Sequence, residues 1–206
     1  MPRTKEQFEK MRKATRDKIQ LAAMRLFVQK GFGSTSVHEI SDLAGISIGL
    51  LYRQYKTKEE LFNDLVEYSL TSIKNIIDFF EKDDSPRELV NQFVYKVYND
   101  IINGEELANL LILMAQSFLS GAANPKQNEI IELDTKMLQA TAKCIERGQE
   151  LGEFRPGNAN ELATLFYSAI QGMAMIKISL KESFIMPSPS VITSILFNWL
   201  LYQIFT

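Results

Sequence analysis

Apolar residues along most of the chain recur with the period of a helix. On a first helix that ends near Lys30 they occupy positions i, i+3, i+4, i+7 and i+8, namely Ile19, Ala22, Ala23, Leu26 and Phe27. No segment alternates convincingly with a period of two, so we predict no strands. The pattern therefore predicts an all-α protein of about nine helices.

Glycine, proline and polar turn residues divide the rest of the chain into segments of helical length. Two of the expected helix starts carry capping signals, Thr57 with Glu60 and Ser85 before Pro86. The segment 105–120 is apolar on nearly every face, which is typical of a helix enclosed by others. The helices that we predict beyond residue 57 are 58–82, 86–102, 105–120, 126–151, 158–182 and 188–205.

Residues 35–55, with the sequence TSVHEISDLAGISIGLLYRQY, hold two short helical patterns on either side of Gly45. Apolar residues are expected on their inner faces: Val37, Ile40 and Leu43 in the first helix, and Ile46, Leu50 and Leu51 in the second. Glycine permits the tight turn between them. The pattern predicts a helix-turn-helix, whose second helix meets base edges in a DNA major groove.

The expected DNA contacts lie on and around this motif. Thr35 or Ser36 can cap the first short helix and Ser47 the second, which leaves hydroxyls and helix N-termini available to phosphate oxygens. The other expected contacts are Ile48, Gly49, Leu50, Tyr52, Arg53, Tyr55 and Lys58. An alternative is a pair of short packing helices in an unrelated bundle, which does not explain the turn, the tyrosines and a basic N-terminal arm together.

The net charge of −2 conceals an asymmetry along the chain. Residues 1–65 hold 12 Lys+Arg and 8 Asp+Glu, whereas residues 66–206 hold 11 and 17. The basic arm consists of Arg3, Lys5, Lys10, Arg12, Lys13 and Arg16. This distribution indicates that the first part meets a polyanion, to which the arm adds attraction that does not depend on sequence.

The stretch from about residue 13 to residue 65 resembles the N-terminal pattern of the TetR family. The matching residues are Ile19, Ala22, Ala23, Leu26, Phe27, Gly31, Thr35, Ile40, Ala44, Gly45, Ile46, Ser47, Gly49, Leu51, Tyr52, Tyr55, Lys58, Glu59 and Leu61. The resemblance implies a helix-turn-helix DNA-binding domain at 1–65, a helical ligand-binding and dimerisation domain at 66–206, and usually repression relieved by a small molecule. Ile48 departs from it, because many members carry a polar or basic residue there; an isoleucine would meet an apolar group such as a thymine methyl.

Two sets of residues in the larger domain are candidate contacts. An apolar or aromatic small-molecule effector is expected to meet Phe79, Phe93, Tyr98, Met114, Phe118, Met137 and Phe166, although the same residues would equally well fill a core. A two-fold homodimer through 158–182 and 188–205 is expected to use Ala169, Gly172, Met173, Phe197 and Leu201. The alternative to the dimer is a monomer with a fully buried C-terminal helix.

The inventory of chemical groups argues against an enzyme. The one histidine, His38, lies on the first short helix, and no metal-ligand spacing, phosphate loop or nucleophile motif occurs, so we expect no catalytic residue, metal or cofactor. The single cysteine, Cys144, and the absence of a signal-peptide pattern indicate a soluble cytoplasmic protein with no membrane contact. A second possibility keeps the DNA-binding domain but gives the larger domain a protein partner in place of a small molecule.

Overall fold

The chain folds as a set of helices, as the apolar period predicts. The computed structural model describes residues 4–103, 109, 113 and 126–197, and these contain eight α-helices, one short 3-10 helix and no strand. The helices are α1 (Lys5–Lys30), α2 (Val37–Ala44), α3 (Ile48–Gln54), α4 (Lys58–Phe80), α5 (Pro86–Asn103), α7 (Gln127–Glu150), α8 (Ala159–Leu180), η1 (Lys181–Ser183) and α9 (Pro189–Thr193).

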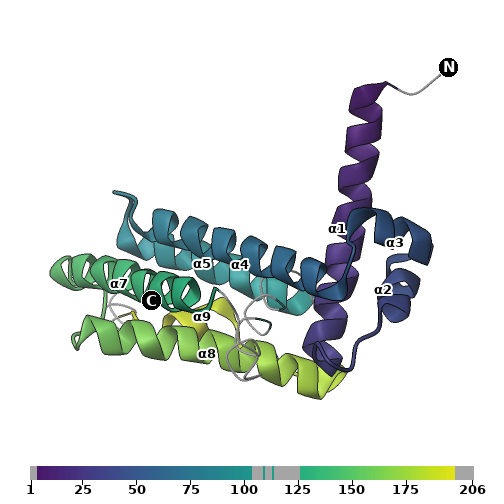
Figure 1. Ribbon diagram of the computed structural model, residues 1–206. Helices are drawn as coiled ribbons and strands as arrows, with labels where there is room; N and C mark the ends of the chain where they lie inside the picture. The colour runs from purple at the N-terminus through teal and green to yellow at the C-terminus, as the bar shows by residue number, and fades with distance from the viewer. Residues whose placement is uncertain (1–3, 104–108, 110–112, 114–125, 198–206) are drawn as a thin grey trace.

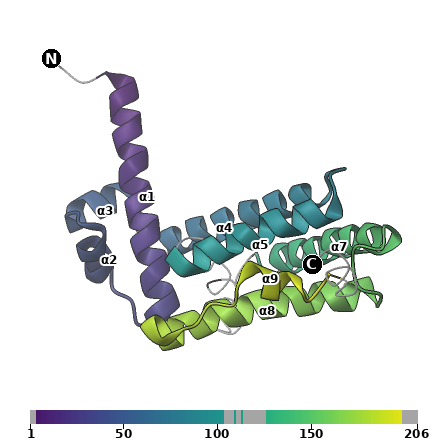
Figure 2. The same cartoon turned by 180° about the vertical axis from the view of Figure 1, so that it is seen from behind.

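The helices form a small N-terminal part and a larger body. Helix α1 crosses one end of the body, and α2 and α3 lie on the far side of α1 (Figure 1). In the body, α7 packs against α4, α5 and α8 (Figures 1 and 2). Helix α4 joins the two parts, because its beginning packs on α1 and the rest of it packs on α7. The expected domain boundary at residue 65 therefore falls inside α4.

Side-chain caps define the beginnings of the N-terminal helices. The Ser36 hydroxyl accepts a hydrogen bond from the Glu39 amide at 3.2 Å, and the Glu39 carboxylate accepts one from the Ser36 amide at 2.9 Å. This reciprocal capping box satisfies donors that have no partner within the helix. The predicted Thr57 cap is present too, since its hydroxyl accepts from the Glu60 amide at 3.0 Å.

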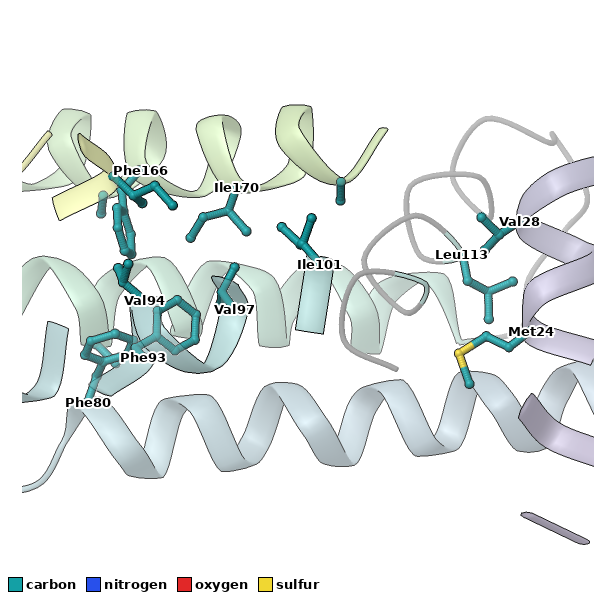
Figure 3. Packing of buried hydrophobic residues seen from close by; sticks show 14 of the residues in the cluster. Met24, Val28, Phe80, Phe93, Val94, Val97, Ile101, Leu113, Phe166 and Ile170 are labelled. Atoms are coloured by element: carbon teal, nitrogen blue, oxygen red, sulfur yellow. The ribbon is translucent and has the colours of Figure 1, made fainter. Parts of the chain in front are cut away.

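One core runs through both parts of the molecule. In the body it includes Phe80, Phe93, Val94, Val97, Ile101, Phe166 and Ile170 (Figure 3). Beside α1, the buried Leu113 lies next to Met24 and Val28 (Figure 3). The segment between α5 and α7 thus contributes a side chain to the core at the N-terminal part, and burial of apolar surface there holds the two parts together.

Most predicted helices of the body are confirmed to within two residues at each end, namely those at 58–82, 86–102, 126–151 and 158–182. The predicted helix 105–120 lies outside the described residues except for Asn109 and Leu113. The predicted helix 188–205 is wrong over 194–197. Helix α9 ends at Thr193, and Phe197 forms an isolated bridge with Phe154 while the Arg155 amide donates to the Leu196 carbonyl at 2.8 Å.

Candidate DNA-binding interface

The α2–α3 unit has the backbone geometry of a helix-turn-helix. Gly45 ends α2 in the left-handed conformation, with φ 64° and ψ 39°, which costs glycine little. The Ile46 amide donates to the Ser41 carbonyl at 3.0 Å, which closes the turn. The Ser47 hydroxyl then accepts from the Leu50 amide at 3.3 Å and caps α3. These bonds fix the angle at which α3 leaves the turn.

The inner face of α2 differs by one residue from the prediction. Ile40 and Ser41 are buried and Val37 and Ala44 pack against the core, whereas Leu43 is exposed. The positions that face inward follow the spacing i, i+3, i+4, i+7, and Leu43 falls outside this arc. The expectation that Leu43 faces inward is therefore wrong.

The outer face of α3 presents polar and open positions to solvent. We define this face by the exposed residues Ser47, Gly49, Tyr52 and Arg53, of which Tyr52 is 50 % exposed. Nothing lies within 4 Å of the position that a Cβ at Gly49 would take, so the backbone there is open to close approach. Ile48 and Leu50 are half-buried at the edge of the same face. Ser36, which caps α2, is also exposed.

Three of the expected DNA contacts are instead engaged within the protein. Thr35 is buried, and its hydroxyl donates to the Gly31 carbonyl at 2.9 Å. The Lys58 ammonium donates to the carbonyls of Phe32 and Thr35 at 2.7 and 2.8 Å and lies 4.4 Å from the centre of the Phe32 ring. The lysine therefore secures the loop between α1 and α2. Because these donors already have partners inside the fold, Thr35 and Lys58 are corrected from surface contacts to structural residues.

Tyr55 is the third expected DNA contact that is engaged within the protein, since its side chain is only 3 % exposed. Its hydroxyl donates to Asp64 Oδ2 at 2.5 Å and accepts from Arg16 Nε at 3.1 Å. Arg16 also pairs with the Asp64 carboxylate, and Gln20 Nε2 donates to it at 2.7 Å. Sequence reasoning missed Asp64 and Gln20, because nothing local marks residues of α1 and α4 that meet only after folding.

Burial and hydrogen bonding shift the pKa of Asp64 in opposite directions in this network. Burial raises the pKa of the Tyr55 phenol, and its hydrogen bond to Asp64 raises it further, so the phenol stays protonated as the donor. Burial alone raises the pKa of Asp64, but hydrogen bonds from Tyr55, Arg16 and Gln20 outweigh burial and hold that pKa below its ordinary value. The network therefore joins an ionised carboxylate on α4 to the residue that ends α3.

The expected effector contacts do not form a single group. Phe93 and Phe166 lie together, with ring centres 6.0 Å apart, in an aromatic cluster that also holds Phe79, Phe80 and Tyr167. Met137 belongs to a second apolar cluster between α4 and α7, and Tyr98 is half-buried and packs against the main core. Met114 and Phe118 lie outside the described residues.

Tyr167 is a residue of the aromatic cluster that the sequence reasoning passed over. Its hydroxyl lies 3.0 Å from the Thr141 hydroxyl, so the cluster contains a polar pair between α7 and α8. Burial raises the pKa of the phenol. Its position next to Phe166 in the chain was the one available signal, because the rings of both residues meet Phe93.

Helix α8 has a large apolar outer face. Leu165, Met175, Ile176 and Leu180 are about half exposed, with Gly172 and Ala169 between them. By length and composition, Ala159–Ser183 also passes the criterion for a membrane span. However, its inner residues, among them Ala163, Phe166 and Ile170, are buried in the core of this fold. A helix with one side in the core and a second apolar side outside it has surface left for another contact.

The expected interface residues divide between this outer face and the core. Ala169 and Gly172 are half-buried, and Met173 packs partly against the core. Phe197 is wrong as an interface residue, because it is buried within its own chain, stacks on Phe154 with ring centres 5.3 Å apart, and has Arg87 above its ring. Leu201 lies outside the described residues.

The part of the chain that the structure describes contains no group of three or more His, Cys, Asp and Glu side chains able to hold a metal ion. His38 is exposed on α2, and Cys144 is buried and free. Burial raises the pKa of the Cys144 thiol, which lowers its reactivity. These residues give no geometry for catalysis.

Comparison with protein families gives a match over the same stretch of chain that carries the helix-turn-helix. Residues 19–65 match the model of bacterial regulatory proteins of the tetR family. Relatives include two uncharacterised HTH-type transcriptional regulators of Bacillus subtilis, each 26 % identical. YerO is aligned over 68 % of this chain and 49 % of its own length, and YxaF over 82 % of this chain and 87 % of its own length.

Solved structures share the fold over most of the chain. The MbdR regulator from Azoarcus sp. CIB superposes with a TM-score of 0.71 at 22 % identity and covers 89 % of this chain and 97 % of its own. AibR, in a complex with isovaleryl coenzyme A and operator DNA, superposes with a TM-score of 0.62 at 16 % identity, covering 86 % and 93 %. At these identities the likeness concerns the fold.

Proposed function

Because this chain belongs to the TetR family of helix-turn-helix transcriptional regulators, we propose that it is a cytoplasmic repressor that binds a near-palindromic operator as a homodimer and leaves it when an apolar or aromatic small molecule binds. The observation that carries the DNA part is the outer face of α3, which is rigidly capped yet solvent-exposed. In this proposal Ser36, Ser47, Tyr52 and Arg53 hold phosphates or base edges, while Gly49 permits close approach and Ile48 and Leu50 meet apolar groups in the groove.

The homodimer is supported by the outer face of α8. An isologous interface brings the same patch of two subunits together, and the small residues Ala169 and Gly172 would let two copies of α8 approach closely. The bulky side chains beside them, Leu165, Met175 and Ile176, would then be covered. A two-fold dimer presents two copies of α3 to half-sites about one helical turn apart, or a small multiple of that.

Matched substitutions on exposed leucines test the dimer. Leu165→Glu places a charge on the outer face of α8, whereas Leu151→Glu places the same charge on the exposed residue after α7. Sedimentation at micromolar concentration should give a monomer for Leu165→Glu and a dimer for Leu151→Glu and for the parent protein. A parent protein that sediments as a monomer and still protects both half-sites would contradict the homodimer.

Small-molecule control is supported by the fold, which in AibR accompanies both isovaleryl coenzyme A and operator DNA. For this chain we place the effector among the aromatic and methionine side chains of the body, with Phe79, Phe93, Tyr98, Met137 and Phe166 as the described candidates. Helix α4 runs from this region to the end of α3, so a shift of α4 would alter the spacing of the two α3 helices in a dimer.

One observation favours the second possibility, a protein partner in place of a small molecule. The rings of Phe79, Phe80, Phe93, Phe166 and Tyr167 contact one another, as they would in a filled core. In that case a protein partner would bind the exposed surface of the body, and no small molecule would bind in its interior.

Selection and footprinting on genomic DNA test the proposal as a whole. The full chain should enrich fragments with a near-palindromic site, and binding should weaken steeply with salt. A panel of uncharged aromatic compounds, titrated with and without the selected DNA, then tests release. A compound that binds the DNA-free form tenfold more tightly shifts the equilibrium by about 1.4 kcal/mol. DNA must then weaken the binding of that compound by the same factor. No preference among fragments would overturn the DNA-binding proposal, and equal affinities in both titrations for every compound would favour the protein partner.

A further inference from the structure

Within the described residues, the first half of α1 makes no tertiary contact that explains its side chains. Helix α1 has 26 residues, yet every residue from Thr4 to Ala14 is exposed and burial begins only at Ile19. In both views this half stands clear of the other elements and extends beyond α3 (Figures 1 and 2). At about 1.5 Å per residue, a projection of ten residues is about 15 Å long.

One face of this projection is apolar and continues the buried face of α1. Phe8, Met11 and Thr15 follow the spacing i, i+3, i+7, and Ile19 takes the next position on the same line. Phe8 is 57 % exposed and Met11 is 47 % exposed, so no other part of the described chain covers them. Paired apolar side chains held in water on a rigid helix are typical of a contact surface.

The direction of this face follows from Arg16. Arg16 lies one turn after Arg12, and its guanidinium reaches Tyr55 at the end of α3 and Asp64 in α4. Residues one turn apart share a side of a helix. Arg12 is therefore on the side of α1 that faces the α3–α4 junction, and Phe8 and Lys5, one and two turns before it, share that side. Met11, three residues after Phe8, lies at the edge of the same side.

We propose that this face of α1 lies along the DNA next to the site that α3 contacts, and that it lengthens each half of the operator contact. The inference rests on the proposed function, since it takes operator DNA as the partner. The projection carries Lys5, Lys10, Arg12 and Lys13 against two acidic residues, and none of these four cations forms an ion pair within the described residues. The projection leads away from Arg16, whose guanidinium reaches Tyr55 at the end of α3, and its length matches about four base pairs. Lys5 and Arg12 bind phosphates, and Phe8 and Met11 pack on deoxyribose carbons.

The decisive experiment compares two double variants that remove equal charge from exposed positions. Lys5→Gln/Arg12→Gln alters the projection, and Lys96→Gln/Lys143→Gln alters the body far from α3. On the operator selected by the parent protein, the slope of log K against log salt should decrease in magnitude by about 3.6 for the first variant, because the dimer loses two phosphate contacts in each subunit and each contact contributes about 0.9. Its hydroxyl-radical footprint should shorten at both outer ends. The body variant should keep the slope and the footprint of the parent protein.

Phe8→Ala/Met11→Ala tests the apolar contribution. It should weaken operator binding several-fold at every salt concentration, with the slope unchanged, and leave the melting temperature and the sedimentation coefficient as in the parent protein. If the apolar pair instead packs against a second copy of the chain, the sedimentation coefficient changes, which contradicts the inference. A parent protein that binds the operator while both projection variants keep its affinity, slope and footprint overturns this inference and leaves the proposed function standing. A parent protein that selects no DNA overturns both.

Discussion

The hydroxyl of Tyr55, the residue that ends α3, donates a 2.5 Å hydrogen bond to Asp64 in the second turn of α4. Arg16 and Gln20 bring α1 to the same carboxylate. Three helices thus meet at one partly buried polar point beside α3. A shift of α4 cannot occur without moving or breaking these bonds, so the pair connects the body of the protein to the DNA-binding face.

Tyr52 and Tyr55 should respond differently to the loss of their hydroxyl groups. Tyr55→Phe removes a buried donor and should lower the free energy of unfolding by about 1 to 2 kcal/mol. Tyr52→Phe removes an exposed hydroxyl, so it should leave stability unchanged and weaken operator binding. Urea unfolding and a DNA titration on both variants measure this. Equal stability losses in the two variants would contradict the different roles.

A pH-dependent contribution to stability should come from Glu39. Its hydrogen bond with Lys30, at 2.5 Å, and two further hydrogen bonds from Ser36 lower its pKa from the ordinary 4.5 to about 2. A carboxylate with a depressed pKa stabilises the fold above its unfolded pKa and loses that contribution as the pH falls. The stability difference between the parent protein and Glu39→Gln should therefore be full above pH 4.5, shrink between pH 4.5 and about 2, and disappear below that range.

Because the Glu39 side chain is exposed, part of this contribution should be screened by salt. Thermal unfolding of both proteins across this pH range, at low and at high ionic strength, provides the measurement. A difference that persists unchanged at pH 2 would mean that the charge of Glu39 does not contribute to stability.

Asp134 should have the opposite effect. It is half-buried on α7, has no hydrogen-bond or ion-pair partner among the residues that the structure describes, and its pKa is raised by burial. A raised carboxyl pKa means that the charged form destabilises the folded state. This loss of stability is present at neutral pH and vanishes below the ordinary pKa, where the group is protonated in both the folded and the unfolded state. Asp134→Asn should raise the melting temperature at pH 7, and the gain should decline as the pH falls through the raised and then the ordinary pKa. Asp17→Asn, at an exposed site of α1, is the control and should show no gain.

The helix-turn-helix could be predicted from the sequence because its determinants are local. The caps at Ser36 and Ser47 and the turn at Gly45 act within a few residues, and the structure contains all three. The residue types of Tyr55 and Lys58 predict phosphate contacts, yet their partners are Asp64, Arg16 and the carbonyls of the α1–α2 loop. These contacts span up to 39 residues, and no local pattern signals them.

The predicted helix 188–205 is wrong over 194–197 for a related reason, and residues 198–205 lie outside the described residues. The residues from 188 onward are apolar enough for a long helix, but burial of Phe197 against Phe154 and Arg87 draws the backbone out of the helix after Thr193. Apolar period alone does not distinguish a helix from a short segment that packs by single side chains. Tertiary packing therefore overrode the local preference at this end of the chain.

Phe154 also makes Gly148 a sensitive position. In an exposed helix, glycine to alanine stabilises by about 1 kcal/mol, because alanine loses less backbone freedom on folding. At Gly148, however, an added Cβ would come within 2.6 Å of Phe154 Cε2, and the Phe154 ring is stacked on Phe197 and has no room to retreat. Overpacking of a filled core costs about 1 to 3 kcal/mol, so Gly148→Ala should destabilise the protein.

Gly172→Ala is the matched control, since both glycines lie inside helices. Within one chain nothing lies within 4 Å of the added Cβ at Gly172, so that variant should be more stable than the parent as a monomer. If two copies of α8 pack through Gly172, the same methyl group weakens the dimer. Urea unfolding at low protein concentration and sedimentation equilibrium separate the two effects: Gly148→Ala should lose stability at every concentration, whereas Gly172→Ala should gain monomer stability and raise the dimer dissociation constant. A Gly148→Ala variant as stable as the parent protein would show that Phe154 can move away and that its ring does not pack tightly on Phe197.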